Sequence, residues 1–125
     1  MAPDKPPAFQ FYARDWLADA RVQMMTLAQR GAYIHLLAFA WAEDGLPDDP
    51  DALARLLGVT REHFDAELWP ALEPCWQRRG RKLRNPRLEE VRSDLETYRQ
   101  SRSEAGRRGA EARWQSKATA KRKDG

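Results

Sequence analysis

Five basic residues lie within seven positions in the second half of the chain, a density of positive charge that suits a polyanion. They are Arg78, Arg79, Arg81, Lys82 and Arg84. Lysine and arginine side chains bind the phosphate oxygens of nucleic acids, and such contacts supply the affinity that does not depend on base sequence. The alternative is a solvated surface. We expect these residues to contact a DNA backbone, because five cations beside an acidic segment exceed what solubility needs.

A second basic group near the C-terminus surrounds one aromatic residue. Its members are Arg107, Arg108, Arg113, Trp114 and Lys117. An indole ring among cations can stack on a base while the cations hold the neighbouring phosphates. We therefore expect this group to belong to the same DNA-binding surface as residues 78–84.

The distribution of charge along the chain favours the same function. Residues 1–77 carry 6 Lys/Arg and 12 Asp/Glu, a net charge of −6, whereas residues 78–125 carry 16 and 7, a net charge of +9. An acidic body with a basic end is typical of proteins that bind a polyanion through that end.

The sequence predicts neither an enzyme nor a metal or cofactor site. There is no GxxxxGK[ST] phosphate loop and no HExxH pattern, and Cys75 with His35 and His63 is too small a set for a zinc site. The acidic segment 43–51 lacks the ligand spacing of an EF-hand loop. Its residues instead start a helix, with Asp49 as the N-cap and Pro50 at the first helical position.

The sequence also predicts a soluble, cytoplasmic protein. The segment MAPDKPPAF has no basic region followed by an apolar region, as a signal peptide would have. No apolar run approaches the roughly 18 residues that a membrane span needs.

One apolar helix, residues 26–42, is expected to form the centre of the domain. Thr26 and Gln29 have the spacing of a capping box. Two apolar rows follow at helical spacing, and burial of both rows would make this helix central. The first row comprises Leu27, Gly31, Ile34, Ala38 and Trp41, and the second comprises Tyr33, Leu37 and Ala40. Gly31 suggests a close backbone approach.

The aromatic residues that precede this helix are interpreted as core. Phe9, Phe11 and Tyr12 are expected to form a short strand, and Trp16 and Leu17 to lie in a helical turn that begins near Asp15. The alternative is a platform for base stacking, but such platforms are normally interleaved with cations.

Two short helices and a hairpin are predicted next. Residues 50–57 form a helix that ends at Gly58, and Thr60 caps a second helix that carries Phe64, Leu68 and Trp69 and is limited by Pro70. This is a helix-turn-helix pattern. Residues 75–85 predict a basic hairpin that turns at Gly80, with Trp76 and Leu83 facing inward.

Asn85 and Pro86 begin a long C-terminal helix with a seam of four apolar residues. The seam comprises Leu88, Val91, Leu95 and Tyr98. It either packs on the domain or joins two copies as a coiled-coil homodimer. Beyond Tyr98 the large apolar residues nearly vanish, so the basic tail is expected to be flexible or a frayed helix.

These elements predict a mostly α protein of a small α+β class. Its parts are a loose N-terminal arm at residues 1–8, a winged-helix-like domain at 9–98 and a basic tail at 99–125. The second helix of the helix-turn-helix would expose Arg61, Glu62, Asp65 and Glu67. Carboxylates disfavour base reading in a groove lined by phosphates.

The chain resembles the YdaU-like family of short prophage-encoded proteins, whose domain has no known function. The resemblance covers about residues 9–114. It rests on FYARDWLAD, MTLAQRGAYIHLL, LPDDPDALARLLGV, LRNPRLEEVR and RSEAGRRGAEARW. Similar proteins are encoded in phage replication regions near helicase or helicase-loader genes, which implies a role in starting phage DNA replication. The family has no assigned catalytic residues to transfer.

Three functions follow from these observations. The first is a DNA-binding accessory protein of phage replication, which holds the DNA backbone through the hairpin and the tail. The second is an adaptor that binds a helicase or its loader through the acidic body. The third is a winged-helix transcriptional regulator.

Overall fold

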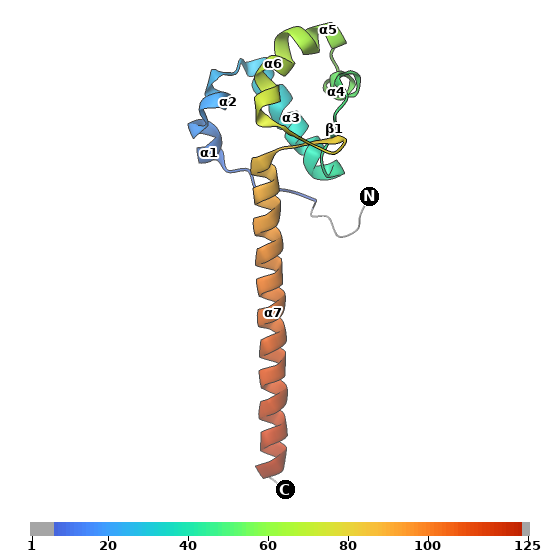
Figure 1. Cartoon of the computed structure of the whole chain (residues 1–125). Coiled ribbons are helices and arrows are strands. Elements are labelled where there is room, and N and C mark those ends of the chain that lie inside the picture. The colour runs from blue at the N-terminus through green and yellow to red at the C-terminus, as the bar shows by residue number, and fades with distance from the viewer. Residues whose placement is uncertain (1–6, 124–125) are drawn as a thin grey trace. The chain divides into compact units, whose positions relative to one another are not determined.

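The computed structural model describes the backbone of residues 7–123 and the side chains of residues 7–114. This part is mostly helical, with a small antiparallel sheet and a long C-terminal helix, as predicted (Figure 1). One compact unit ends at Val91 and a second begins at Arg92. The first unit contains α1 (Ala13–Ala18), α2 (Ala20–Met24), α3 (Leu27–Glu43), β1 (Leu46–Pro47), α4 (Pro50–Leu57), α5 (Arg61–His63), η1 (Phe64–Leu68), α6 (Trp69–Leu72), η2 (Glu73–Cys75), β2 (Gln77–Arg79) and β3 (Lys82–Arg84). Helix α7 (Pro86–Lys123) begins in the first unit and continues as the second.

Helix α3 is the central helix of the first unit, with α1 and α2 on one side and α4 on the other (Figure 1). The predicted capping box is confirmed, since the Gln29 amide donates to Thr26 Oγ1 at 3.1 Å and the Thr26 amide donates to Gln29 Oε1 at 2.8 Å. The second predicted row is buried. Its buried face also includes Ala32, Leu36 and Trp41.

The first predicted row of α3 is wrong except at Trp41. Leu27 is 84% exposed, and Gly31, Ile34 and Ala38 are exposed as well. A Cβ at Gly31 would meet nothing within 4 Å, so the predicted close backbone approach is absent. The helix is therefore covered on one broad face, and apolar spacing alone did not distinguish the covered row from the open one.

The aromatic residues before α3 form no strand, which corrects the prediction, and α1 begins at Ala13. Phe9 packs on Trp41 with ring centroids 5.4 Å apart, and Trp16 stacks on Tyr33 at 5.6 Å. Phe11 and Tyr12 remain exposed. Contacts between rings therefore fix this segment to α3 without a backbone ladder.

Helix α4 forms as predicted. The Asp51 amide donates to Asp49 Oδ1 at 3.0 Å, Pro50 occupies the first turn, and Gly58 ends the helix with a φ of 70°. Leu53 is buried, and Leu56 is half-buried. The acidic loop thus serves as the start of a helix.

The helical run after Thr60 continues past Pro70, which corrects the predicted end of the helix. The His63 amide donates to Thr60 Oγ1 at 3.1 Å, as predicted. In η1, a π-helix, the Trp69 amide donates to the carbonyl of Phe64, five residues earlier. This wider turn lets Pro70, which has no N–H, begin a new helical turn in α6.

The sheet has the strand order β1-β3-β2, with antiparallel pairs. The predicted hairpin is confirmed, with Gly80 at a φ of 64° and with Trp76 and Leu83 buried. Strand β1 was not predicted, and it pairs Leu46 with Leu83. The hairpin is therefore attached to the loop that follows α3.

Helix α7 begins at Pro86, with Asn85 as its cap. Leu88 and Val91 are buried in the first unit, Leu95 is half-buried, and Tyr98 is 59% exposed. The start of the predicted seam therefore packs on the domain. The structure has residues 99–123 in helical conformation as well.

Candidate nucleic-acid interface

Arg78 of the hairpin is paired with carboxylates of the same unit. Its Nε lies 3.0 Å from Asp48 Oδ2, and its Nη2 lies 3.6 Å from Glu73 Oε2. Both carboxylates come from segments that precede the hairpin in the chain. The Arg78 charge is therefore partly neutralised before any polyanion arrives.

Arg84 is also held in place by the fold. Its Nη1 lies 2.8 Å from Asp44 Oδ1 and 3.2 Å from Glu89 Oε1, and its side chain is largely buried. The hydrogen bond to Asp44, with a smaller contribution from Glu89, raises the pKa of Arg84. A guanidinium between two carboxylates fixes β3 to its neighbours and offers little charge to a phosphate.

The three remaining hairpin cations lie around the turn. Lys82 Nζ donates to the Asp44 carbonyl at 3.1 Å, and Arg79 Nη2 donates to Gln77 Oε1 at 3.3 Å. Arg81 has no side-chain partner among the residues that the structure describes. Because their partners are neutral or absent, Arg79, Arg81 and Lys82 are the hairpin residues that keep charge for an anion.

The arginines of α7 are more open than those of the hairpin. Arg107, Arg108 and Arg113 are exposed, and Trp114 is 74% exposed. Arg108 Nη2 lies 3.9 Å from Glu104 Oε2, and Arg113 Nε donates to the Gly109 carbonyl at 3.4 Å. The side chain of Lys117 lies outside the described residues. A helix with these side chains can present cations and one indole to a polyanion.

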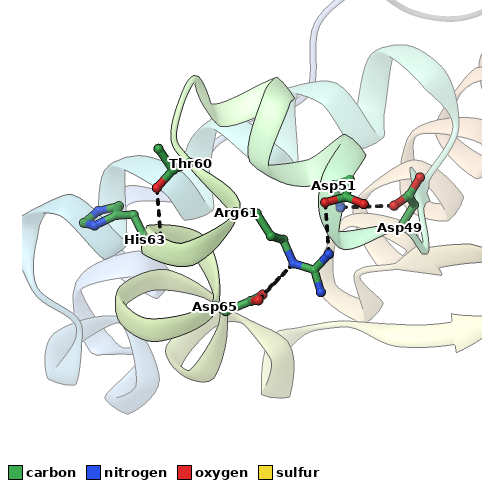
Figure 2. Close-up of polar contacts among 6 residues, drawn as sticks. All are labelled: Asp49, Asp51, Thr60, Arg61, His63 and Asp65. Atoms are coloured by element: carbon green, nitrogen blue, oxygen red, sulfur yellow. Dashed lines mark hydrogen bonds and ion pairs between the residues drawn. The ribbon is translucent and has the colours of Figure 1, made fainter.

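The helical run that begins at Arg61 has no free cation at its start. Figure 2 shows Arg61 between Asp51 of α4 and Asp65 of η1, at 3.0 and 2.9 Å. These hydrogen bonds, with Asp51 as the larger cause, raise the pKa of Arg61. Glu62 and Glu67 remain exposed on the same helical run. This surface is acidic, and it disfavours entry into a DNA groove.

A groove of about 440 Å³ was not predicted from the sequence. Its walls are mainly aromatic and aliphatic: Phe9, Phe11, Tyr12, Trp16, Tyr33, Leu37, Leu88 and Val91. Its polar groups have partners within the protein. Arg87 pairs with Asp15 and Glu90 and lies over the Tyr12 ring at 5.1 Å, and Asn85 donates to Tyr33. The sequence signal for this groove is the density of aromatic residues between Phe9 and Trp16, which the sequence analysis interprets as core.

The described residues contain no group of three or more His, Cys, Asp or Glu side chains arranged to hold a metal ion. None of their helices has both the length and the apolar character that crossing a membrane requires.

The comparisons with known proteins concern mainly the first unit. The family model described as "Protein of unknown function (DUF1376)" matches residues 7–91. The match ends at Val91, the last residue of the first compact unit. No curated protein and no solved structure matches the chain.

Proposed function

We propose, on the premise that the chain belongs to the DUF1376 family of proteins of unknown function, that it binds the phosphate backbone of DNA. The principal contacts come from Arg107, Arg108 and Arg113 of α7, with Arg79 and Arg81 of the hairpin as a secondary group. The resemblance to YdaU-like proteins supports an accessory role in the initiation of phage DNA replication.

The distribution of net charge between the two units carries this proposal. Residues 1–91 contain 12 Lys/Arg and 14 Asp/Glu, a net charge of −2, whereas residues 92–125 contain 10 and 5, a net charge of +5. Within the first unit the strongest hairpin pairs use Arg78 and Arg84, which leaves fewer free cations than the sequence suggests. The second unit should therefore bind a polyanion more strongly than the first unit does.

The order of elements supports a winged-helix interpretation of the first unit. Helix α3 is followed by β1, then α4, the helical run from α5 to α6, and the β2–β3 hairpin. β1 pairs with β3, as expected when a strand between the helices completes the sheet of the wing. The acidic surface around Glu62 and Glu67 argues for backbone binding rather than base reading.

Titration of a fluorescent DNA duplex and of a single strand over a range of salt tests the proposal. Log affinity for the duplex should fall linearly with log salt, by about 0.9 for each phosphate contact. Changing Arg107, Arg108 and Arg113 to Gln should therefore reduce this slope by about 2 to 3. The matched variant with Arg79 and Arg81 changed to Gln should reduce it less. A slope near zero for the parent protein would exclude backbone binding.

The aromatic groove favours a second candidate function, an adaptor for a helicase or helicase loader. Because Arg87 and Asn85 already have partners within the protein, the groove suits an apolar side chain of another protein better than a polar small molecule. Changing Phe11 to Ala should weaken binding of a purified loader and leave DNA affinity unchanged. Loader binding that is insensitive to this change would exclude the groove.

A further inference from the structure

From Leu27 to Ala42, the solvent-exposed face of α3 carries no Lys, Arg, Asp or Glu. The one such residue in this range is Arg30, which is half-buried and donates to two backbone carbonyls of α2 at 2.9 and 3.0 Å. Leu27 is 84% exposed and Ile34 is 39% exposed. The other exposed residues of the face are Ala28, Gly31, His35, Ala38 and Ala42. A surface helix normally presents charged or polar side chains to water, so this face is typical of an interaction site.

Two hollows adjoin this face on the side of α4. The first has a volume of about 330 Å³, and its walls include His35 of α3 and Leu57 of α4. The second has a volume of about 390 Å³, and its walls include Phe39 and Leu56. His35 and Phe39 are one helical turn apart, with ring centroids 5.0 Å from each other, so the hollows follow each other along α3. Together with the exposed face they form a groove, the α3–α4 groove, which extends over residues 28–43, about 22 Å.

An α-helix fits the α3–α4 groove better than an extended peptide does. The backbone groups of α3 and α4 bond within each helix, so the walls offer no strand edge to an extended peptide. A helical ligand satisfies its own backbone and needs only side-chain contacts. Small residues at Ala28, Gly31 and Ala38 let a second helix approach closely, and the space beside Gly31 is open. A helix of about 15 residues would fill the length of the groove.

The charges at one end of the groove define the chemistry of the ligand. Glu62 and Glu67 are exposed, and they directly precede His63 and Leu68, which line the first hollow. Neither glutamate has an ion pair in the part of the chain that the structure describes. Arg61, the nearest cation in the sequence, is held by two other carboxylates (Figure 2). This end of the groove is therefore acidic, and it complements a ligand that carries Lys or Arg.

We propose that the α3–α4 groove binds an amphipathic α-helix of another protein, with bulky apolar side chains on one face and Lys or Arg on the flank that meets Glu62 and Glu67. At the other end Glu43 and Arg55 line the second hollow together, so the charges there balance. A nucleic acid is a poor occupant, because the acidic end repels phosphates. The α3 face of a second copy is also a poor occupant, because it has no cation to meet these glutamates. The inference does not rest on DNA binding, since no Lys or Arg of the hairpin or of α7 takes part.

A synthetic peptide tests the groove in the full chain. The probe has about 16 residues of leucine, alanine and lysine, with the leucines along one helical face and the lysines along its flank. Fluorescence anisotropy should show that one peptide binds per chain. A peptide of the same composition in scrambled order should bind at least about tenfold more weakly, because it has no apolar face. Failure of the patterned peptide to bind at about 100 µM, or equal binding of both peptides, would overturn the proposal.

Substitutions on α3 locate the binding site. Leu27→Lys and Gly31→Lys should each weaken binding of the patterned peptide by about tenfold or more, because each places a cation in the apolar contact. Both positions are exposed, so circular dichroism should show folded proteins. Leu17→Lys is the matched control, because Leu17 is 67% exposed on α1, on the other side of α3 (Figure 1). It should leave the affinity unchanged, as should Phe11→Ala in the aromatic groove. Equal losses at Leu17 and Leu27 would overturn the assignment to the α3–α4 groove.

A charge reversal tests the acidic end of the groove. The double variant Glu62→Lys, Glu67→Lys should bind the lysine peptide about tenfold more weakly. It should instead prefer a peptide with glutamate at the lysine positions. The same preference in the parent protein and the double variant would overturn the predicted charge of the ligand. Sedimentation equilibrium identifies the alternative occupant: a dimer that Leu27→Lys dissociates would show that a second copy covers this face, which would also overturn the proposal.

Discussion

The Asn85 side chain donates from Nδ2 to the Tyr33 hydroxyl at 3.0 Å inside the first unit. The same nitrogen donates to the Cys75 carbonyl at 2.9 Å, and Asn85 Oδ1 accepts from the Leu88 amide at 2.9 Å. Asn85 is 2% exposed. One buried amide thus joins α3, the end of η2 and the start of α7.

Asn85→Ala should lower the free energy of unfolding by about 2 to 4 kcal/mol. The loss of the α7 cap costs about 1 kcal/mol, and buried groups left without partners cost about 1 to 3 kcal/mol. Chemical denaturation measures the change. Asn85→Asp is the matched variant, because it keeps the acceptor for Leu88 and replaces only the donor. An Asn85→Ala protein as stable as the parent would show that this amide does not join the three elements.

Stability should decline at alkaline pH because of Tyr33. Burial, with a smaller effect of Cys75, raises the pKa of Tyr33 to about 12 from its ordinary value of 10.0. As the pH rises, Tyr33 loses its proton in the unfolded chain before it does so in the folded protein. Its contribution to stability is therefore complete below about pH 10 and is lost as the pH rises toward 12. The full loss is on the order of 2 to 3 kcal/mol. Burial also raises the pKa of the Cys75 thiol, which acts in the same direction.

Denaturation midpoints between about pH 8 and pH 11 test this expectation. Tyr33→Phe should be less stable at neutral pH, because Asn85 loses an acceptor, but its stability should fall less steeply above pH 10. An equal decline in both proteins would assign the alkaline loss to other groups.

Local features of the fold were predictable because short-range chemistry determines them. The caps at Thr26, Asp49 and Thr60, the turn at Gly80 and the helix end at Gly58 each depend on residues a few positions apart. Burial depends on distant segments and was predicted less well. Helical spacing placed Leu27 in a buried row, yet no element of the described chain covers it.

The candidate interface was predicted only in part, for the same reason. The sequence shows five cations between Arg78 and Arg84, but the carboxylates that pair with Arg78 and Arg84 include Asp48 and Asp44, which lie far back in the chain. Strand β1 has only two residues, too few for a recognisable alternating pattern. Its pairing with β3 attaches the loop that contains these carboxylates to the hairpin.

Truncation should affect two leucines of α3 very differently. Leu36 is 0% exposed, so Leu36→Ala should cost about 2 to 5 kcal/mol through lost apolar contacts and a cavity. Leu27→Ala should change the free energy of unfolding by less than about 0.5 kcal/mol, because that side chain is exposed. Thermal or chemical denaturation of both variants checks this. Similar losses would mean that the first apolar row is covered after all.

Two glycines should also respond oppositely to alanine. Gly31 lies inside α3 with open space around it, so Gly31→Ala should stabilise the protein by about 0.5 to 1 kcal/mol. Gly45 has a φ of 109°, and an added Cβ would lie 3.3 Å from the Leu83 carbonyl. Gly45→Ala should therefore destabilise by about 1 to 3 kcal/mol. Denaturation curves of both variants measure the change in the free energy of unfolding. A loss of stability in Gly31→Ala would show that another group lies close to that position.

Hydrogen exchange should separate the two units of the chain. In the free protein, the amides of residues 99–114 should exchange rapidly. Gly106 and Gly109 each weaken the helix by about 1 kcal/mol, and no large apolar stripe offsets the entropy of ordering this segment. The amides around Leu36 should exchange slowly, because opening them requires unfolding of the core.

Adding DNA to the same sample should slow exchange across residues 99–114, because bound phosphates favour the ordered helix. A protein adaptor would behave differently. DNA would leave this segment unchanged, and a helicase or loader would instead protect the amides that line the aromatic groove, around Tyr12 and Trp16. Slow exchange of residues 99–114 in the free protein would contradict both candidate functions. The arginines of this segment would then belong to a helix that the chain stabilises by itself.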